Sequence, residues 1–531
     1  MSGAAPRQRW MSWAIVGAVT LVALAIRLVV LQQPVVGDEL STFWIVNGNG
    51  LSGVVSTVYS DAEISPPFFF LLAKVFSVFG ATGTSVRLPS MVAGVAVIPV
   101  FYLIGLRTLG RNGGYLAAAF ACLSPFLVYF SANARAYSVM ILTLALATLA
   151  LVVATSENGK WWHWLGWAVA SALAVYSHYV GALAVGGQVI WVLICCPGSR
   201  WKVIGWSAVA ALLFAPWLGG FRADLNSPTS DILQGIQQTG FEARLRNTQE
   251  LIFLRIQVGS APIFWSRPDV LLGALGLIVA AVGIGRRISS GGLRIFRGER
   301  ARGALLPLLM VLAVILGELL LLAIGTDIYG IRNLAPVWAG LPLVFAAICV
   351  AAGRKPGSIA AVILAIALGF GSIWLADPGH TGVPYKDATE LIDGREVPAE
   401  AVIDGSILSP APQTSLDIYL KGDYRVIDLT NIKDEPDFIE HIYDPYDIQA
   451  LSDRAFEGPG PVELVTLDRQ RTPFAEDGPG GSKYRFHMNG QTVLIPGGWT
   501  MVSQTEFGGL LPLTVSRFEQ ESGDAKGSPG K

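Results

Sequence analysis

The feature that most constrains this sequence is a series of eleven apolar stretches, each about long enough to cross a bilayer. A transmembrane helix needs about 20 largely apolar residues. The composition agrees, because 52% hydrophobic and 15% charged residues lie outside the range of soluble domains. We therefore predict a mostly α-helical, multi-pass membrane bundle whose first stretch is an uncleaved helix. The stretches cover residues 11–31, 88–106, 113–130, 136–153, 163–179, 180–196, 203–220, 269–285, 304–324, 333–352 and 357–375.

Arginine and lysine residues between these stretches predict the orientation of the chain. A further apolar run, residues 66–80, is short and contains Lys74, so we place it on the membrane surface as an interfacial helix. With the N-terminus inside, the cytoplasmic segments hold 15 cations and two anions, whereas the outer loops before residue 377 hold nine cations and ten anions. Positive charge favours the cytoplasmic side. The prediction is about eleven spans, a cytoplasmic N-terminus and an outer C-terminus.

A change of pattern at Asp377 predicts a second domain. Residues 377–531 hold 13 Lys+Arg and 26 Asp+Glu, whereas the first 376 residues hold 25 and 13. A short helix and several β-type runs divided by Gly, Pro and Asp are expected there, at 386–392, 401–403, 424–427, 462–465 and 492–495. We predict a transmembrane domain over 1–376, a small outer α/β domain over 377–518 and a disordered tail over 519–531.

Several classes of function are disfavoured by what the sequence lacks. It has no phosphate-binding glycine loop, no His-Glu-x-x-His motif and no nucleophile elbow, so a nucleotide-driven pump is disfavoured. No inverted repeat is recognisable, which weakens a transporter interpretation. The four cysteines lie in or beside apolar runs, so no cysteine metal site or disulfide framework is predicted. No nucleic acid is expected among the partners.

The first outer loop is rich in carboxylates. Asp38 and Glu39 follow the first span directly, and Asp61 and Glu63 precede the surface helix. The simplest interpretation of Asp38 and Glu39 is a solvated helix cap. Four carboxylates in one short loop exceed what a cap requires, so we treat them as candidates for catalysis or substrate binding.

Among the nine cations predicted on the outer side, four are candidates for binding: Lys74, Arg87, Arg135 and Arg332. Each could be explained as a side chain reaching the interface, which is how we interpret Arg27. Arginines that converge on an acidic loop would instead form a phosphate site beside a proton acceptor, because the planar guanidinium binds phosphate oxygens in pairs.

Polar and aromatic residues at the outer ends of two spans complete the candidate set. Asn133 and Tyr137 flank Arg135, and His178 and Tyr179 end another span. A histidine among aromatics is more often a packing residue than a ligand, and only its predicted level beside the acidic loop makes His178 a candidate. Glu318, within a span, is either a protonated packing residue or part of a cavity wall.

In the order and spacing of these pieces the chain resembles the C-type glycosyltransferases, and within them the protein O-mannosyltransferase-like family (glycosyltransferase family 39) that includes bacterial lipid A aminoarabinose transferases. The similarity covers roughly residues 10–375. Its pieces are Gly37-Asp38-Glu39, Ser65-Pro66-Pro67-Phe68, Arg87-Leu88-Pro89-Ser90, Ser124-Pro125 through Arg135-Ala136-Tyr137, Ser177-His178-Tyr179, and Arg332 followed by Pro336.

The resemblance implies an inverting transfer of a sugar from a polyprenyl-phosphate carrier to an envelope glycan, lipid or protein, at the outer face of the inner (plasma) membrane. At the matching position Asp38 resembles the general base of the family, with Glu39 beside it. Arg135 and Arg332, with Arg87 or Lys74 as a third donor, would bind the donor phosphate. A divalent cation is not required, although the carboxylates are able to bind one, and the sequence assigns no metal ligands.

Two alternatives stay open at this point. One is a transporter or flippase of lipid-linked saccharides, which would form no glycosidic bond. The other is a noncatalytic envelope protein whose acidic domain recruits partners. The sequence does not define the sugar, the acceptor, the role of the C-terminal domain or the oligomeric state.

Overall fold

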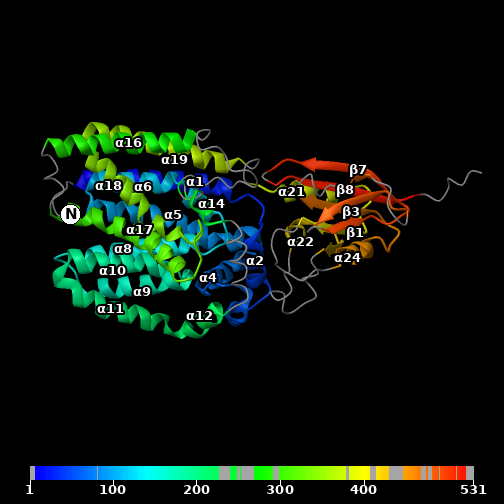
Figure 1. Cartoon of the computed structure of the whole chain (residues 1–531), viewed down its shortest axis with the longest axis horizontal. Helices are drawn as coiled ribbons and strands as arrows, with labels where there is room; N and C mark the ends of the chain where they lie inside the picture. Colours follow the sequence, from blue (N-terminus) through cyan, green and yellow to red (C-terminus); the bar gives the residue numbers. More distant parts are fainter. Residues whose placement is uncertain are drawn as a thin grey trace, which may run out of the picture. The chain divides into compact units, whose positions relative to one another are not determined.

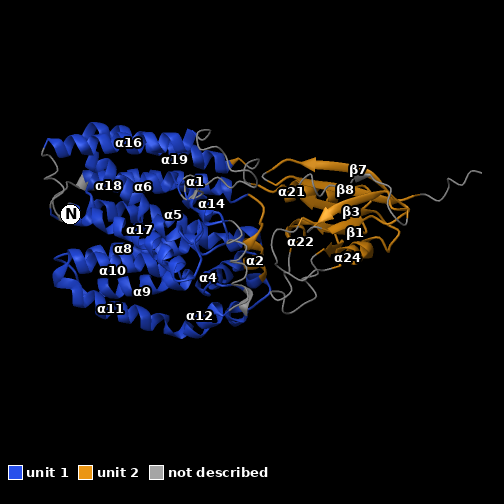
Figure 2. Cartoon of the chain, in the orientation of Figure 1, with its two compact units in different colours: residues 1–32, 45–376 blue, residues 33–44, 377–531 orange. Residues whose placement is uncertain are grey.

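The structure is a computed structural model of the chain and divides into two compact units (Figure 2). The first comprises Met1–Gln32 and Ile45–Ala376, and the second comprises Gln33–Trp44 and Asp377–Lys531. We predicted one continuous transmembrane domain over residues 1–376. In the structure, Gln33–Trp44 belongs to the second unit instead. The structure describes residues 6–80, 82–226, 240–246, 248, 252, 268–290, 298–377, 382–406, 414–429, 447–467, 474–475, 481–488, 491–509 and 511–521.

The first unit is a helical bundle (Figure 1). Among the described residues, seven helices are long and apolar enough to cross a membrane. The prediction of a mostly α-helical multi-pass membrane protein is therefore confirmed. These helices are α1 (Pro6–Val30), α5 (Gly83–Thr108), α8 (Tyr137–Ala154), α11 (Arg200–Phe214) continued to Leu225 by a 3-10 turn and α12 (Leu218–Leu225), α16 (Pro268–Ser289), α17 (Glu299–Ala323) and α19 (Arg354–Ala376).

The other four predicted spans are shorter or broken helices, so the count of eleven stays a prediction. The stretch 113–130 forms two helices, α6 (Arg111–Leu123) and α7 (Pro125–Ser131), bent by 58°. The break follows from Pro125, which has no backbone N–H, while the Ser124 hydroxyl caps α7 by accepting from the Leu127 N–H. The remaining three are α9 (Trp161–Ser177), α10 (Gly181–Cys195), and α18 (Leu341–Ala352) preceded by a 3-10 turn at Ala335–Ala339.

The predicted interfacial helix exists as α4 (Phe68–Phe76), followed by a 3-10 turn at Ser77–Phe79. Phe69 and Phe70 are fully buried, whereas Val78 and Phe79 are 79% and 73% exposed. Exposed apolar side chains at the end of a buried helix are typical of a segment that dips into lipid. Together with α12 and α14 (Phe241–Arg246), α4 lies at the end of the bundle away from the N-terminus (Figure 1).

Small residues allow the helices of the bundle to approach closely. A Cβ atom on Gly105 of α5 would lie 2.8 Å from the Gly113 carbonyl oxygen of α6, and one on Gly187 of α10 would lie 2.7 Å from the Leu309 carbonyl oxygen of α17. Association of helices in lipid depends on such close packing, since no hydrophobic effect drives it there. These glycines therefore bring α5 against α6 and α10 against α17.

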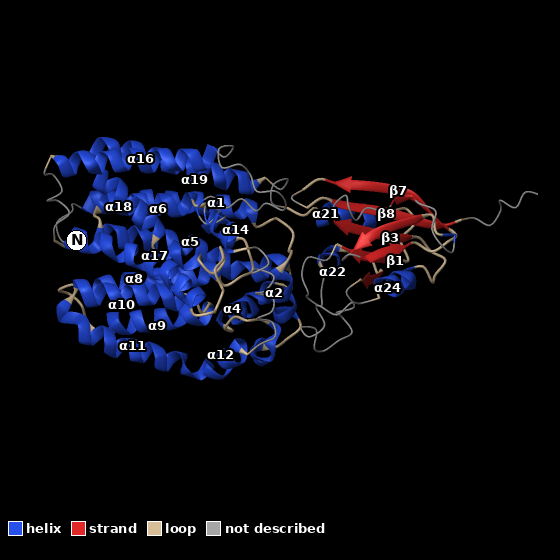
Figure 3. Ribbon diagram, in the orientation of Figure 1, coloured by secondary structure: helices blue, strands red, loops and turns tan. Residues whose placement is uncertain are grey.

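The second unit contains a five-stranded mixed sheet in the order β2-β1-β3-β8-β7, with helices packed beside it (Figure 3). β1 is parallel to β2 and β3, and β8 is antiparallel to β3 and β7. The predicted α/β fold is confirmed, as are its helix and its four strands. The elements are α21 (Tyr385–Asp393), β1 (Ala401–Gly405), α22 (Ser415–Tyr419), β2 (Arg425–Asp428), α24 (Ile448–Ala455), β3 (Val462–Leu467), β7 (Trp499–Phe507) and β8 (Leu513–Gln520), with β4 (Phe474–Ala475), β5 (Tyr484–Met488) and β6 (Gln491–Leu494) in a separate sheet.

The end of the second unit differs slightly from the prediction. β8 continues to Gln520, two residues into the segment that was predicted to be disordered. Leu513, Val515 and Phe518 are fully buried against the rest of the unit, which explains why the strand runs this far. Residues 522–531 of the predicted tail lie outside the described residues.

Two carboxylates on neighbouring parallel strands give the second unit a pH-dependent stability. Asp404 of β1 pairs in register with Asp428 of β2, and both side chains are buried. The Asp404 Oδ1 accepts hydrogen bonds from the backbone N–H (2.9 Å) and the hydroxyl (2.6 Å) of Ser406. Burial, together with the nearby Asp428 charge, raises the pKa of Asp404 to about 6.

Because the folded state holds this proton more tightly than the unfolded chain, the stabilisation is complete below about pH 4 and is lost as the pH rises through about 6. We expect Asp404→Asn, which stays neutral, to stabilise the unit at pH 7.5 and to have little effect at pH 4.5. Thermal unfolding of the full chain in detergent at both pH values measures this. The exposed Asp423→Asn is the matched control. A stability difference between Asp404→Asn and the unmutated chain that does not change with pH would contradict the assignment.

Candidate functional site

Asp38 and Glu39 form the first turn of α2 (Asp38–Asn47). Gly37, directly before the helix, has φ +60°, a left-handed conformation that residues with a side chain rarely adopt. The glycine therefore turns the chain so that α2 begins at the two carboxylates. Asp38 is half-buried and Glu39 is buried, and both belong to the second unit.

The segment before Asp38 is held by side chains of α22. The Val35 N–H donates to the Tyr419 hydroxyl (2.8 Å), and the Ser415 hydroxyl donates to the Val35 carbonyl oxygen (2.9 Å). Val35 and Leu40 are buried and pack with Ile418. Sequence reasoning did not predict this arrangement, since nothing in the local pattern links residues 33–44 to a helix almost 400 residues later.

In the first unit, Arg135 and Glu63 form a two-pronged ion pair. The Arg135 Nη1 lies 2.5 Å from Glu63 Oε2, and Nη2 lies 2.8 Å from Oε1. Their side chains are 12% and 11% exposed, so the pair is largely shielded from water. The Ser90 hydroxyl of α5 donates to the Arg135 carbonyl oxygen (3.0 Å) and fixes the turn that carries the arginine. The structure thus joins a predicted phosphate-binding residue to a predicted substrate-binding residue.

Two further candidates lie beside this pair. The rings of Tyr137, at the start of α8, and His178, at the end of α9, are 5.4 Å apart. Arg135 is close enough to His178 to act on it electrostatically. The His178 Nδ1 is buried without a hydrogen-bond partner among the described residues. Four candidates therefore lie together at one end of the bundle: Glu63, Arg135, Tyr137 and His178. The sequence had placed each of them at the same predicted level, without showing that they are neighbours.

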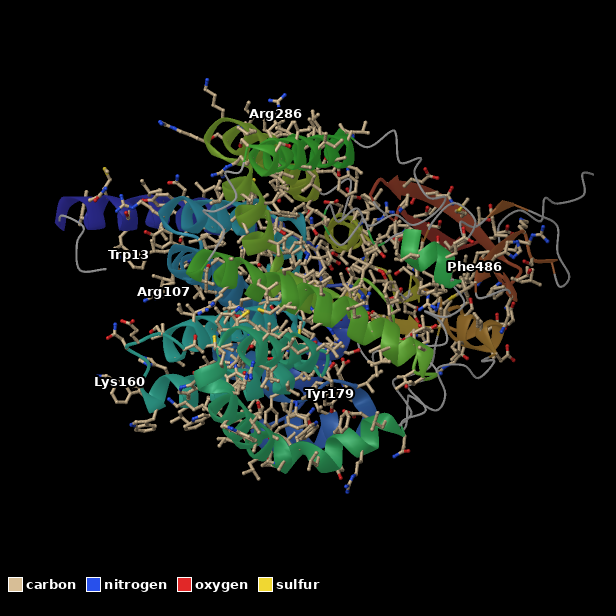
Figure 4. All side chains as sticks on the ribbon, turned by 60° about the vertical axis from the view of Figure 1, so that its left-hand side comes forward. Trp13, Arg107, Lys160, Tyr179, Arg286 and Phe486 are labelled. Atoms are coloured by element: carbon tan, nitrogen blue, oxygen red, sulfur yellow. The ribbon has the colours of Figure 1, made fainter. Side chains whose placement is uncertain are left out.

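Tyr179 belongs to a second polar group. Its hydroxyl donates to Asp224 of α12 and accepts from the Trp217 Nε1 (2.9 Å). The ring also contacts Phe221, with centroids 4.9 Å apart. Sequence reasoning missed Asp224, whose only signal was its place just after a predicted span. Figure 4 shows Tyr179 away from Arg107 and Lys160, two residues of the predicted cytoplasmic segments.

The other predicted cations have different surroundings. The Lys74 ammonium donates to the Val46 carbonyl oxygen (2.9 Å), and the buried Arg87 donates to that of Leu31 (3.2 Å). Arg332 is exposed and precedes the 3-10 turn at Ala335–Ala339. These contacts leave Lys74 and Arg87 with a structural role in the described state, and a role in phosphate binding stays a prediction.

The two remaining polar candidates are Asn133 and Asp61. The Asn133 carbonyl oxygen accepts from the Arg135 N–H (2.8 Å), and its side-chain Oδ1 is buried without a hydrogen-bond partner among the described residues. Asp61 lies in a π-helical turn at Val58–Ala62 that leads to Glu63, and its side chain lies outside the described residues.

A second ion pair was missed by sequence reasoning. Arg244 of α14 binds Asp327 through two hydrogen bonds of 2.8 and 2.6 Å, and it also donates to the Tyr329 carbonyl oxygen (2.8 Å). The hydrogen bonds from Arg244 lower the pKa of Asp327 and keep it ionised. The pair joins α14, in the loop that was predicted to lie outside, to the turn before Arg332. In the sequence, the only sign of this ion pair was the opposite charge of the two residues. Because they are 83 residues apart, the sequence did not show that they pair.

Arg27 does not reach the interface, so its interpretation as a snorkelling side chain was wrong. It is fully buried, and its Nε donates to the Ser131 hydroxyl (3.0 Å) while Nη1 donates to the Ala23 carbonyl oxygen (3.1 Å). Gly94 of α5 makes room for this contact, because a Cβ there would lie 1.8 Å from the Ser131 oxygen. Arg27 therefore ties α1 to the end of α7. Glu318, on α17, is likewise fully buried.

Comparison with known proteins gives one match by sequence and several by structure. The family described as dolichyl-phosphate-mannose-protein mannosyltransferase matches residues 64–219. No curated protein matches the chain in a sequence search. The matched segment runs from the residue after Glu63 to the second residue of α12, so it includes Arg135, Tyr137, His178 and Tyr179.

Among solved structures, ArnT from Cupriavidus metallidurans in the apo state has a TM-score of 0.52 at 12% identity, over 96% of this chain and 98% of that one. The same protein bound to undecaprenyl phosphate has a TM-score of 0.52 at 12% identity, over 99% and 100%. An oligosaccharyltransferase from Archaeoglobus fulgidus has a TM-score of 0.46 at 12% identity, over 86% and 69%. The fold shared with ArnT and the family match over residues 64–219 together confirm that this multi-pass membrane protein resembles the C-type glycosyltransferases, as the sequence predicted.

Proposed function

We propose that this chain is a membrane glycosyltransferase that moves a sugar from a polyprenyl-phosphate carrier to an envelope glycan, lipid or protein, with inversion at the anomeric carbon. The reaction would take place at the outer face of the inner membrane. The observation that carries the proposal is the match of residues 64–219 to a mannosyltransferase family, on a fold shared with ArnT along nearly the whole chain. The similar structure with undecaprenyl phosphate supports a polyprenyl-phosphate donor.

Asp38 is the proposed general base, with Glu39 beside it. An acceptor hydroxyl must lose its proton as it attacks the anomeric carbon, and a positioned carboxylate typically accelerates such a step by about 100- to 10,000-fold. Asp38 lies in the first turn of α2, and the left-handed turn at Gly37 directly before it sets where this helix begins. The new glycosidic bond forms as the bond to the carrier phosphate breaks, so the configuration at the anomeric carbon inverts.

The leaving group is the lipid phosphate, whose negative charge grows as the sugar departs. Arg135 is the proposed principal phosphate ligand, with Arg332, Arg87 and Lys74 as further donors. Fixed cations aimed at a developing charge lower the barrier because they need little reorganisation during the reaction. The proposed sugar and acceptor contacts are Asp61, Glu63, Asn133, Tyr137, His178 and Tyr179. We propose that no divalent cation is obligatory, since the leaving group is a monophosphate and not a diphosphate.

Sugar transfer by the purified full-length protein tests this function against the flippase alternative. The assay uses detergent-solubilised protein, a set of synthetic short-chain polyprenyl-phosphate sugars and an envelope glycan extract, with products read by mass spectrometry. We expect a new glycosidic bond and release of polyprenyl phosphate, also in the presence of EDTA. Movement of the intact lipid-linked sugar across vesicles without any new bond would overturn the proposal in favour of a flippase.

A further inference from the structure

The second compact unit contains a contact to the segment directly before Asp38, the proposed base. Residues 33–44, which carry Asp38, belong to the same compact unit as residues 377–531. In this unit α22 contacts the segment directly before Asp38. Two side chains of α22 bind both backbone polar groups of a single residue, Val35.

These two hydrogen bonds replace the backbone pairing that Val35 would have in a helix or sheet. The N–H donates to the Tyr419 hydroxyl (2.8 Å), and the carbonyl oxygen accepts from the Ser415 hydroxyl (2.9 Å). Val35 is fully buried and Ser415 is 2% exposed, so the hydrogen bond between them is shielded from water. A buried backbone group that loses its partner is costly, and this makes the position of Val35 well defined.

Apolar packing extends the attachment to both sides of Asp38. Val35 lies three residues before it and Leu40 two residues after it, and both are buried with Ile418 of α22. Gly37 provides the left-handed turn between them. With both flanks fixed to one helix, the first turn of α2 has little freedom to shift relative to α22.

The helix that provides these contacts is itself well anchored. Thr414 and Asp417 cap it reciprocally, since the Thr414 Oγ1 accepts from the Asp417 N–H (3.3 Å) and the Asp417 Oδ2 accepts from the Thr414 N–H (3.0 Å). Leu416 is fully buried in an apolar cluster that includes Val402 and Val465 of the central strands. α22 is thereby fixed to the sheet of the second unit.

We propose that Tyr419 and Ser415 are positioning residues for Asp38, so that the C-terminal unit is a structural part of the catalytic site. This inference rests on the proposed function, in which Asp38 is the base. Tyr419 and Ser415 act through the backbone of Val35 and need no contact with substrate. A displacement of about 1 Å in a reacting group can cost on the order of 100-fold in rate.

The test compares Tyr419→Phe/Ser415→Ala with two matched controls in the same unit. Tyr424→Phe removes a hydroxyl that donates to the Ile392 carbonyl oxygen (3.4 Å), and Ser452→Ala removes a buried hydroxyl on α24. We expect the paired variant to lower kcat for sugar transfer by about 10- to 100-fold, with the KM for the donor changed less than about twofold. The controls should keep kcat within about twofold. An unchanged kcat in the paired variant would overturn the proposal.

A double-mutant cycle separates positioning from general damage to the fold. In the Asp38→Asn background the paired variant should cause no further loss, because the group that it positions is already disabled. An equal loss in both backgrounds would show that α22 supports the fold only, and would also overturn the proposal. Ser415→Ala alone, a smaller change, serves if the paired variant is not recovered from the membrane.

Hydrogen–deuterium exchange tests the attachment without relying on sugar transfer. We expect faster exchange at residues 35–42 in the paired variant and unchanged exchange there in both controls. Unaltered exchange at residues 35–42 would contradict the attachment itself. The exchange differences could be as expected while the unmutated protein transfers no sugar. In that case the proposed function fails, but the role of α22 in holding this segment stands.

Discussion

Asp38→Asn is expected to lower sugar transfer by about 100- to 10,000-fold, because the amide cannot accept the proton of the acceptor hydroxyl. The change is nearly isosteric and lies at a half-buried position, at the start of α2. We therefore expect normal expression, membrane insertion and binding of polyprenyl phosphate. Initial rates of transfer by purified protein, with the donor and the acceptor varied separately, measure the effect on kcat and on each KM.

The matched control is Asp423→Asn, which makes the same chemical change at an exposed position of the same unit. It should transfer sugar at the rate of the unmutated protein. Full activity in Asp38→Asn would rule out Asp38 as the base and would shift attention to Glu39. Loss of lipid binding together with transfer would instead point to a structural role for the first turn of α2.

Arg135→Gln is expected to lower kcat/KM for the donor by about 100- to 1,000-fold, the size of effect seen when one fixed donor to a developing anion is removed. Arg135→Lys should recover little of this loss, because a single ammonium cannot reproduce the two parallel hydrogen bonds of a guanidinium. Steady-state kinetics over a range of donor concentrations distinguish weaker binding from slower chemistry.

Because Arg135 pairs with Glu63, substituting both residues separates the effect on stability from the effect on sugar transfer. Arg135→Gln leaves the Glu63 carboxylate, 11% exposed, without its ion-pair partner, and this should lower the thermal stability of the protein. The double variant Glu63→Gln/Arg135→Gln should recover much of that stability and none of the transfer. Recovery of transfer in the double variant would mean that Arg135 only neutralises Glu63.

Much of the fold could be predicted because its signals are local. Apolar stretches of the right length predicted the helices of the bundle, and β-type runs between turn residues predicted β1, β2, β3 and β6. The helix lengths were less predictable. Pro125 bends the third predicted span into α6 and α7, and the stretches 163–179, 180–196 and 333–352 form helices of 17, 15 and 12 residues. That each of these stretches crosses the membrane stays a prediction.

The candidate site was predictable only as a list of residues. Polar side chains at the outer ends of spans stood out, so Arg135, Glu63, Tyr137 and His178 were identified without knowledge of their partners. Arg27 was misjudged because its surroundings come from α6 and α7, and a cation near a span end has the same sequence signature whether it faces lipid or the bundle.

The sequence by itself determined the membrane character, the positions of the helices and strands, and which residue types were available for chemistry, since all of these follow from hydrophobic length, periodicity and turn residues within one segment. Only the tertiary structure decided that Glu63 pairs with Arg135 across 72 residues, and that the segment before Asp38 is held by Ser415 across 380 residues. The physical reason is that a hydrogen bond or ion pair depends on distance in space. The residues next to a polar group in the chain do not show which distant group will be its partner in that bond or ion pair.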